Sequence, residues 1–190
     1  HLLGQVRLGV TPEVLGQEDK VAFGCIDIDL PEMPFSEKYD LVLSLKNKLF
    51  EDYGLNALIE TSKSKGFHLW VFFSLHQERI FIQNILQDVI NNTTDCKIAN
   101  GEIEVFPKGE KGNAIFLPFF GVFKNENTLN ESYFAAKKTT FVKGKKLKVI
   151  KNPLDAIHQT ILQNDSILPI LKNLCKYPRC VRKVLFEWKK

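Results

Sequence analysis

Residues 21–29 constrain the fold most, because they form a mainly apolar and β-branched run that ends in alternating acids. Such a run predicts a central strand, and the prolines that follow it predict a turn. Alternate side chains of a strand face opposite ways, so Asp27 and Asp29 share one face, about 7 Å apart. Two carboxylates this close repel each other unless a cation lies between them, and hard divalent ions take such ligands. The alternative is an acidic strand end in solvent.

The hydrophobic periodicity of the other segments predicts a mixture of strands and helices. We expect helices over residues 36–53 and 76–90, strands over 57–62, 67–73, 102–106 and 114–117, a hairpin over 141–150, and helical segments near 153–163, 166–174 and 179–188. Ser36 suits an N-cap and Gly54 suits a helix stop. This order predicts an α+β fold with a mostly antiparallel sheet over residues 1–151 and a helical C-terminal extension over 152–190.

The composition excludes several classes of protein. Of the 190 residues, 44% are hydrophobic and 25% are charged, which argues against disorder. No apolar stretch approaches the ~20 residues of a membrane-spanning helix, and no signal peptide is visible. The four cysteines form no Cys-x-x-Cys pair, so we expect reduced thiols and a cytoplasmic protein without a membrane partner. A zinc site built on Cys175 and Cys180 is the alternative, but no second pair lies near them.

Charge is distributed unevenly along the chain. Residues 1–60 carry 11 acidic and 5 basic side chains, whereas residues 61–190 carry 11 acidic and 21 basic ones. Seven lysines and no acid lie between residues 136 and 151. This segment predicts a nucleic-acid partner, and the alternative is a solvated lysine-rich face. The candidate nucleic-acid-binding residues are Lys137, Lys138, Lys143, Lys145, Lys146 and Lys148.

A small basic turn precedes the strand that contains His68. Ser64, Lys65 and Gly66 offer hydroxyl, ammonium and backbone N–H groups within a few residues of the imidazole. A triphosphate needs many donors and positive charge at close range, so this turn is a candidate phosphate site. The alternative is an ordinary hairpin turn followed by a histidine packed beside Trp70.

Residues 102–108 place two more acids on one face of a strand. Glu104 could therefore complete a site of three carboxylates with Asp27 and Asp29. Lys108 follows it, and a basic glycine loop over residues 111–113 comes next. The alternative is an edge strand with exposed glutamates.

The three motifs together resemble those of the archaeo-eukaryotic primase superfamily. An Asp-x-Asp at 27–29, a Ser-x-Gly-x-His at 64–68 and a hydrophobic–acid–hydrophobic motif at 103–105 follow one another at roughly 35-residue steps. Neighbouring blocks over about residues 5–120 are similar to the branch of primase-polymerases found in mobile elements, conflict systems and CRISPR-associated systems. The resemblance implies a sheet like that of the RNA-recognition motif as the catalytic core.

The resemblance also implies an activity, cofactors and partners. The chain would be a template-directed nucleotidyltransferase, a DNA primase or DNA polymerase, within a longer multidomain protein. Asp27, Asp29 and Glu104 would hold two Mg²⁺ or Mn²⁺ ions. A DNA template and primer and the nucleoside triphosphates would be its partners. The implied nucleotide-binding residues are Ser64, Lys65, Gly66, His68, Lys108 and Asn113.

Two other functions remain open at this stage. The chain could be an inactive nucleic-acid-binding domain, although the intact acids and His68 argue against that. It could also be a metal-dependent nuclease, which likewise uses clustered carboxylates. A nuclease needs no triphosphate cradle, so the turn before His68 favours a nucleotidyltransferase.

Overall fold

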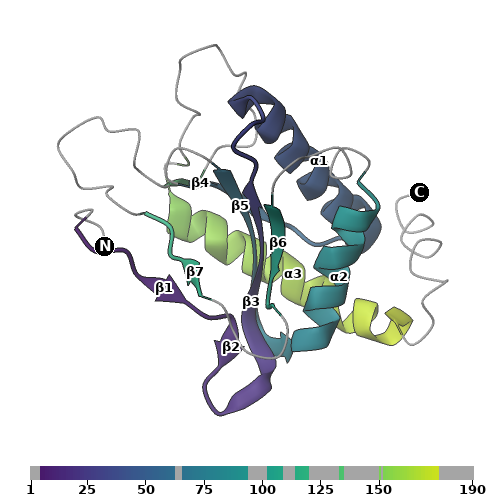
Figure 1. Cartoon of the computed structure of the whole chain (residues 1–190). Coiled ribbons are helices and arrows are strands. Elements are labelled where there is room, and N and C mark those ends of the chain that lie inside the picture. Colours follow the sequence, from purple (N-terminus) through teal and green to yellow (C-terminus); the bar gives the residue numbers. More distant parts are fainter. Residues whose placement is uncertain are drawn as a thin grey trace.

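The computed structural model describes residues 5–62, 66–93, 102–108, 114–119, 133–134, 150 and 152–175. These parts of the chain form eight strands and three helices (Figure 1). The strands are β1 (Gly9–Val10), β2 (Glu13–Val14), β3 (Gln17–Asp29), β4 (Leu58–Ser62), β5 (Gly66–Glu78), β6 (Glu102–Phe106), β7 (Ile115–Phe116) and β8 (Tyr133–Phe134). The helices are α1 (Phe35–Tyr53), α2 (Arg79–Asn91) and α3 (Pro153–Cys175).

Six of these strands form one antiparallel sheet in the order β2-β3-β5-β4-β8, and β6 also pairs with β3. The elements β3, α1, β4, β5, α2 and β6 follow one another as strand, helix, strand, strand, helix and strand. This succession is that of ferredoxin-like and RNA-recognition-motif sheets. The predicted α+β class, the antiparallel sheet and the C-terminal helix are confirmed, and β3 is central because strands pair with both of its edges.

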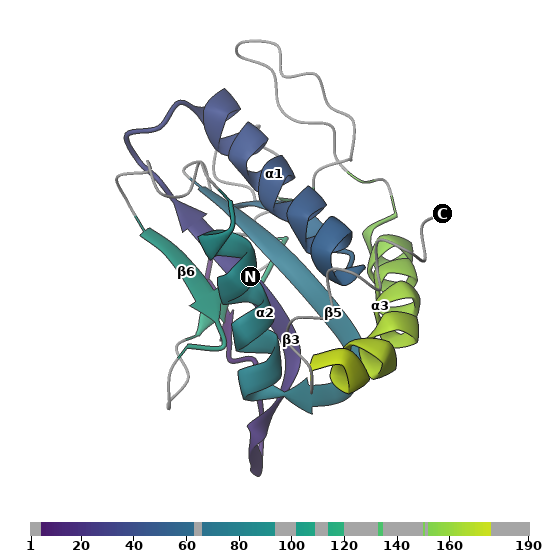
Figure 2. The ribbon, with the colours of Figure 1, turned by 90° about the vertical axis from the view of Figure 1, so that its right-hand side faces the viewer.

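The sheet separates two apolar clusters. Helices α1 and α2 cover one face (Figure 2), where Ile26, Ile28 and Leu69 are buried against the helices. On the opposite face, Cys25 and Trp70 belong to a smaller cluster that includes residues of β7 and α3. The alternation along β3 therefore directs its acids away from α1 and α2, onto the face of the smaller cluster.

Helix α3 packs beside β5 where β4 no longer covers its edge. β4 pairs with β5 only as far as Trp70, so the backbone of β5 beyond that point needs other partners. The fully buried Asn164 supplies them: its amide donates to the carbonyls of Phe72 (3.1 Å) and Asn56 (3.0 Å). Its Oδ1 accepts from the Asn56 N–H at 2.7 Å. One α3 side chain thus replaces part of a strand.

Several predicted boundaries are wrong. α1 begins at Phe35 after Pro34, without a side-chain cap, so Ser36 is not the N-cap. α2 begins only at Arg79, because pairing with β3 extends β5 to Glu78. The segments expected near 153–163 and 166–174 are one helix that continues through Pro169. The helix stop at Gly54 is confirmed by its left-handed φ of 68°.

Some predictions lie outside the described residues. They are the hairpin over 141–150, apart from residue 150, and the helical segment near 179–188. Among the helices that are described, none combines the length and the apolar character needed to cross a bilayer.

We predict that Asn164→Ala lowers the free energy of unfolding by about 2–4 kcal/mol, because it removes three hydrogen bonds to partly buried backbone groups of Asn56 and Phe72. Urea denaturation measures the change. Gln163→Ala, at an exposed position one residue earlier in α3, is the matched control and should change stability little. Equal effects of the two substitutions would contradict this role of Asn164.

Candidate functional site

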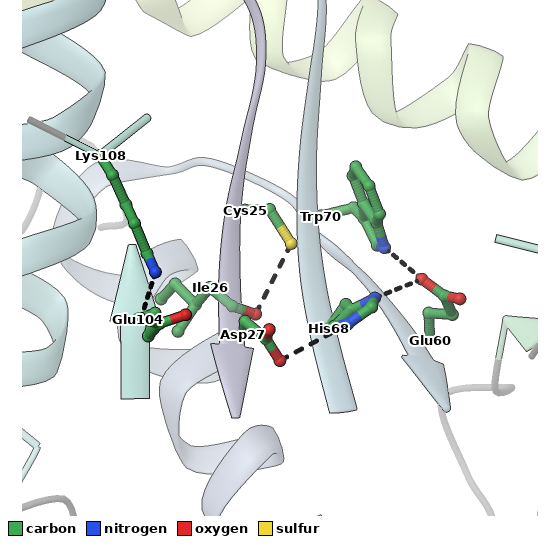
Figure 3. Close-up of polar contacts among 8 residues, drawn as sticks. All are labelled: Cys25, Ile26, Asp27, Glu60, His68, Trp70, Glu104 and Lys108. Carbon is green, nitrogen blue, oxygen red and sulfur yellow. Dashed lines mark hydrogen bonds and ion pairs between the residues drawn. The ribbon is translucent and has the colours of Figure 1, made fainter. Parts of the chain in front are cut away.

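Four ionisable side chains form one row across four neighbouring strands. In the strand register, Asp27 of β3 lies opposite His68 of β5 on one side and opposite Glu104 of β6 on the other. His68 in turn lies opposite Glu60 of β4. Residues directly opposite each other in a sheet project from the same face, so the row Glu104–Asp27–His68–Glu60 stands on the face away from α1 and α2 (Figure 3).

His68 is buried between two carboxylates. Its Nδ1 is 2.8 Å from Oε2 of Glu60, and its Nε2 is 3.4 Å from Oδ1 of Asp27. Burial lowers the pKa of His68, but the hydrogen bond and charge of Glu60, together with the charge of Asp27, outweigh burial, and the net pKa is raised. The imidazole also meets the Trp70 ring edge-on, with 5.9 Å between centroids. His68 is thus both a packed residue and part of a charged row.

The surroundings of Asp27 raise the pKa of its carboxyl group. Burial raises the pKa of its carboxyl group, His68 opposes that shift, and the nearby charges of Glu104 and Asp29 raise the pKa further. Its side chain is 26% exposed, so it can reach a ligand from solvent. A cation near Asp27 would relieve both burial and like-charge repulsion.

Glu104 and Lys108 form an ion pair with each other. The Lys108 ammonium group also lies 5.0 Å from the centre of the Phe106 ring. The roles predicted from the sequence, Glu104 as a metal ligand and Lys108 as a triphosphate ligand, remain predictions beside this ion pair. Both are partly exposed, at 33% and 25%, which leaves each of them accessible to a competing ligand.

The chemistry of the three carboxylates fits a hard divalent ion. Asp27, Asp29 and Glu104 offer oxygen ligands on one face of two paired strands. In the described residues, however, no group of three His, Cys, Asp or Glu side chains is arranged as metal ligands. Glu104 points to Lys108 and Asp27 to His68, so both side chains would have to turn from these partners to bind a metal.

Gly66 brings β5 close to β3 at the end of the site. A Cβ atom at this position would lie 2.4 Å from the carbonyl oxygen of Ile28, well inside contact distance. Gly66 also lies opposite Ser62 of β4, so the ends of the predicted phosphate-binding turn lie next to the acidic end of β3. A glycine is required here by the close approach of two backbones.

Arg7 adds a positive charge to the row from outside the six-stranded sheet. Its guanidinium carbon is 3.7 Å from the centre of the Phe116 ring on β7. Burial lowers the pKa of Arg7, and the charges of Glu60 and Asp27 act in the opposite direction. Arg7 therefore lies within electrostatic reach of two acids in the row.

Comparison with known proteins identifies the family. The family model of the archaeo-eukaryotic primase domain of TOTE conflict systems matches residues 1–163. The chain belongs to this family. Primase-polymerases of this kind are nucleotidyltransferases. The family is part of the conflict-system branch whose motifs this sequence resembles.

Solved structures and curated proteins add less. The polymerase domain of ligase D from Mycobacterium tuberculosis, solved in complex with DNA, is 18% identical with a TM-score of 0.39. The match covers 59% of this chain and 44% of that chain, so it spans less than half of the ligase domain. Similarity at this level carries no functional argument. Comparison with curated protein sequences found no match.

Several predicted site residues of this archaeo-eukaryotic primase domain lie outside the described residues. They are Ser64, Lys65, Asn113, Lys137, Lys138, Lys143, Lys145, Lys146 and Lys148. The structure brings together Asp27, His68, Glu104 and Lys108, and their functional roles remain predictions. Of the predicted reduced thiols, the structure describes that of Cys25. It is a buried free thiol, and burial raises its pKa well above the usual value.

Glu60 and Arg7 were not among the residues predicted to form the site. Glu60 carried a signal, because it is an acid that directly follows Leu58 and Ile59 in the strand Leu58–Ser62. Strand alternation places Glu60 on the same face as Leu58, where a core residue would be expected. The structure explains the carboxylate, because Glu60 lies opposite His68 in the strand register. Arg7 lies far from these acids along the chain, so local patterns could not show that their charges act on it.

Proposed function

We propose that this domain is a template-directed nucleotidyltransferase that joins nucleoside triphosphates to a primer or an initiating nucleotide on a DNA template. The observation that carries the proposal is the row Glu104–Asp27–His68, in which a histidine donor and carboxylate ligands stand side by side on an otherwise packed sheet face. Membership of the archaeo-eukaryotic primase family supports it. A mobile-element or CRISPR-associated context remains a prediction from the resemblance.

In this proposal Asp27, Asp29 and Glu104 would hold two Mg²⁺ or Mn²⁺ ions. Such ions lower the pKa of an attacking 3′-hydroxyl and neutralise charge on the leaving pyrophosphate. Asp27 suits this role because its neighbours Glu104 and Asp29 raise its pKa, and a cation would relieve that repulsion. Ser64, Gly66 and Asn113 would supply further donors to the triphosphate.

His68 would bind the triphosphate through Nε2, the ring nitrogen that faces Asp27. Its raised pKa favours the protonated ring, which is a stronger donor to phosphate oxygen than the neutral ring. Lys108 would leave Glu104 when a metal ion takes its place and would then join Lys65 in neutralising the phosphates. These residues would orient the triphosphate for attack by the primer hydroxyl, and orientation itself contributes to the rate.

We predict that Asp27→Asn with Asp29→Asn lowers Mn²⁺-dependent nucleotide incorporation by about 100-fold or more, because the substitutions remove metal-ligand charge while preserving shape. Extension of a labelled primer on a template measures the loss, and thermal melting checks the fold. Glu18→Gln with Asp19→Asn is the matched control, since both acids are exposed on the far half of β3. Undiminished extension by the folded site variant would end the metal-site proposal, and shortening of the primer by the wild type would favour a nuclease.

We also propose that the lysines between residues 136 and 151 follow the template backbone. Lys145→Ala, Lys146→Ala and Lys148→Ala together should weaken template binding and reduce its salt slope by about one to three units, because each lost phosphate contact removes roughly 0.9. Fluorescence anisotropy at several salt concentrations measures the slope. Lys20, Lys48 and Lys172, changed together to alanine, are the control. A slope that changes equally in both triple variants would indicate a merely solvated lysine face.

A further inference from the structure

Glu60 is buried in a way that an ordinary sheet residue is not. It is 1% exposed, yet it carries a carboxylate on a face whose other buried members are mainly apolar. Burying a charge is costly unless hydrogen bonds and opposite charges compensate it, and an apolar residue of similar size would fill this position at lower cost. The position therefore calls for a role that an apolar side chain could not perform.

A single oxygen of Glu60 accepts two hydrogen bonds. The indole Nε1 of Trp70 donates to Oε2 at 2.6 Å, and Nδ1 of His68 lies 2.8 Å from the same atom. An indole N–H can only donate and an ionised carboxylate can only accept, so Oε2 is the acceptor in both bonds. Nδ1 of His68 is therefore a donor to Glu60, and Nε2, which Figure 3 shows directed at Asp27, can donate to an acceptor there when the ring is protonated.

We propose that Glu60 is the positioning residue of the nucleotide site: it accepts the Nδ1–H of His68 and so fixes the orientation of the ring, with Nε2 facing the triphosphate beside Asp27. The inference rests on the proposed function, because it presumes that His68 contacts a nucleotide. In many functional histidines a carboxylate binds the ring nitrogen that does not contact the ligand. This bond fixes the orientation of the nitrogen that does contact the ligand.

Trp70 holds Glu60 in its turn. The indole ring stacks on Phe72 with 2° between the ring planes and 5.8 Å between centroids, and it packs against Phe23 at 5.2 Å. Packing against Phe72 and Phe23 holds the indole ring in place. Its N–H then holds the Glu60 carboxylate through the bond to Oε2. Arg7 lies within electrostatic reach of the same carboxylate and balances part of its charge. The chain of contacts thus runs from the aromatic cluster through Glu60 to His68.

The test compares a graded series at Glu60 with a control at Ile59, the preceding residue of β4, which is buried on the opposite face of the sheet. Glu60→Leu removes the acceptor, and Glu60→Gln keeps a neutral one. Ile59→Ala makes a packing defect in the same strand on the face away from the Glu60 side chain. With dATP or ATP and Mn²⁺ on a primer–template, we expect the nucleotide KM to rise by about 10-fold or more in Glu60→Leu. It should rise less in Glu60→Gln, with kcat changing less than KM, and stay within about twofold in Ile59→Ala.

A double-mutant comparison separates positioning from general loosening of the sheet. Once His68 is alanine, adding Glu60→Leu should leave KM unchanged, because Glu60 acts only through the imidazole. An equal rise of KM with and without His68, or a rise in Ile59→Ala as large as that in Glu60→Leu, would overturn the proposal. Glu60→Gln supplies the same comparison if the leucine variant fails to fold.

A spectroscopic readout separates failure of this inference from failure of the proposed function. Long-range ¹H–¹⁵N spectra of the protein without nucleotide report which nitrogen of the neutral His68 ring carries the proton, and His68→Ala assigns its signals. We expect Nδ1–H in the wild type and a shift toward the Nε2–H tautomer in Glu60→Leu. An unchanged tautomer would refute positioning by Glu60 even if the enzyme is active. An inactive wild type with the expected tautomer shift would refute the proposed function alone.

Discussion

The register of β3 with β5 and β6 is the constraint on which the site depends. Because β5 and β6 both pair with β3, Asp27 lies opposite His68 and Glu104 at once. A slip of one residue along either strand would send one partner to the opposite face, beneath α1 and α2. Gly66 permits the close approach of β5, since any Cβ there would collide with the Ile28 carbonyl.

Acidic side chains outnumber basic ones in the row, and a cationic ligand would balance their charge. On one side, His68 lies between Glu60 and Asp27, and the pKa shift of the imidazole reflects both acids. On the other side, Asp27 and Glu104 are neighbours of like charge, and in the described part of the chain Lys108 compensates Glu104. Positive charge is therefore most needed between β3 and β6. This imbalance supports a divalent ion there and a triphosphate between that ion and His68.

Local patterns in the sequence predicted the strand that carries Asp27 and Asp29 and the helix stop at Gly54, because each depends on residues close together in the chain. The start of α2 was placed too early because pairing with β3 keeps residues up to Glu78 in a strand. Glu60 escaped notice for the same kind of reason, since its importance arises from cross-strand contacts with His68 and Trp70. The resemblance to primase motifs supplied what periodicity could not, namely which acids belong together.

The position of Mn²⁺ and of a bound triphosphate tests the central claim most directly. A crystal structure with a nucleoside triphosphate and Mn²⁺, with the ions located by anomalous scattering, would measure it. We predict Mn²⁺ between Asp27, Asp29 and Glu104, Lys108 released from Glu104, and a phosphate oxygen within hydrogen-bond distance of His68 Nε2. Nucleotide and Mn²⁺ bound elsewhere, with the contacts of His68 to Asp27 and of Lys108 to Glu104 intact, would contradict the account.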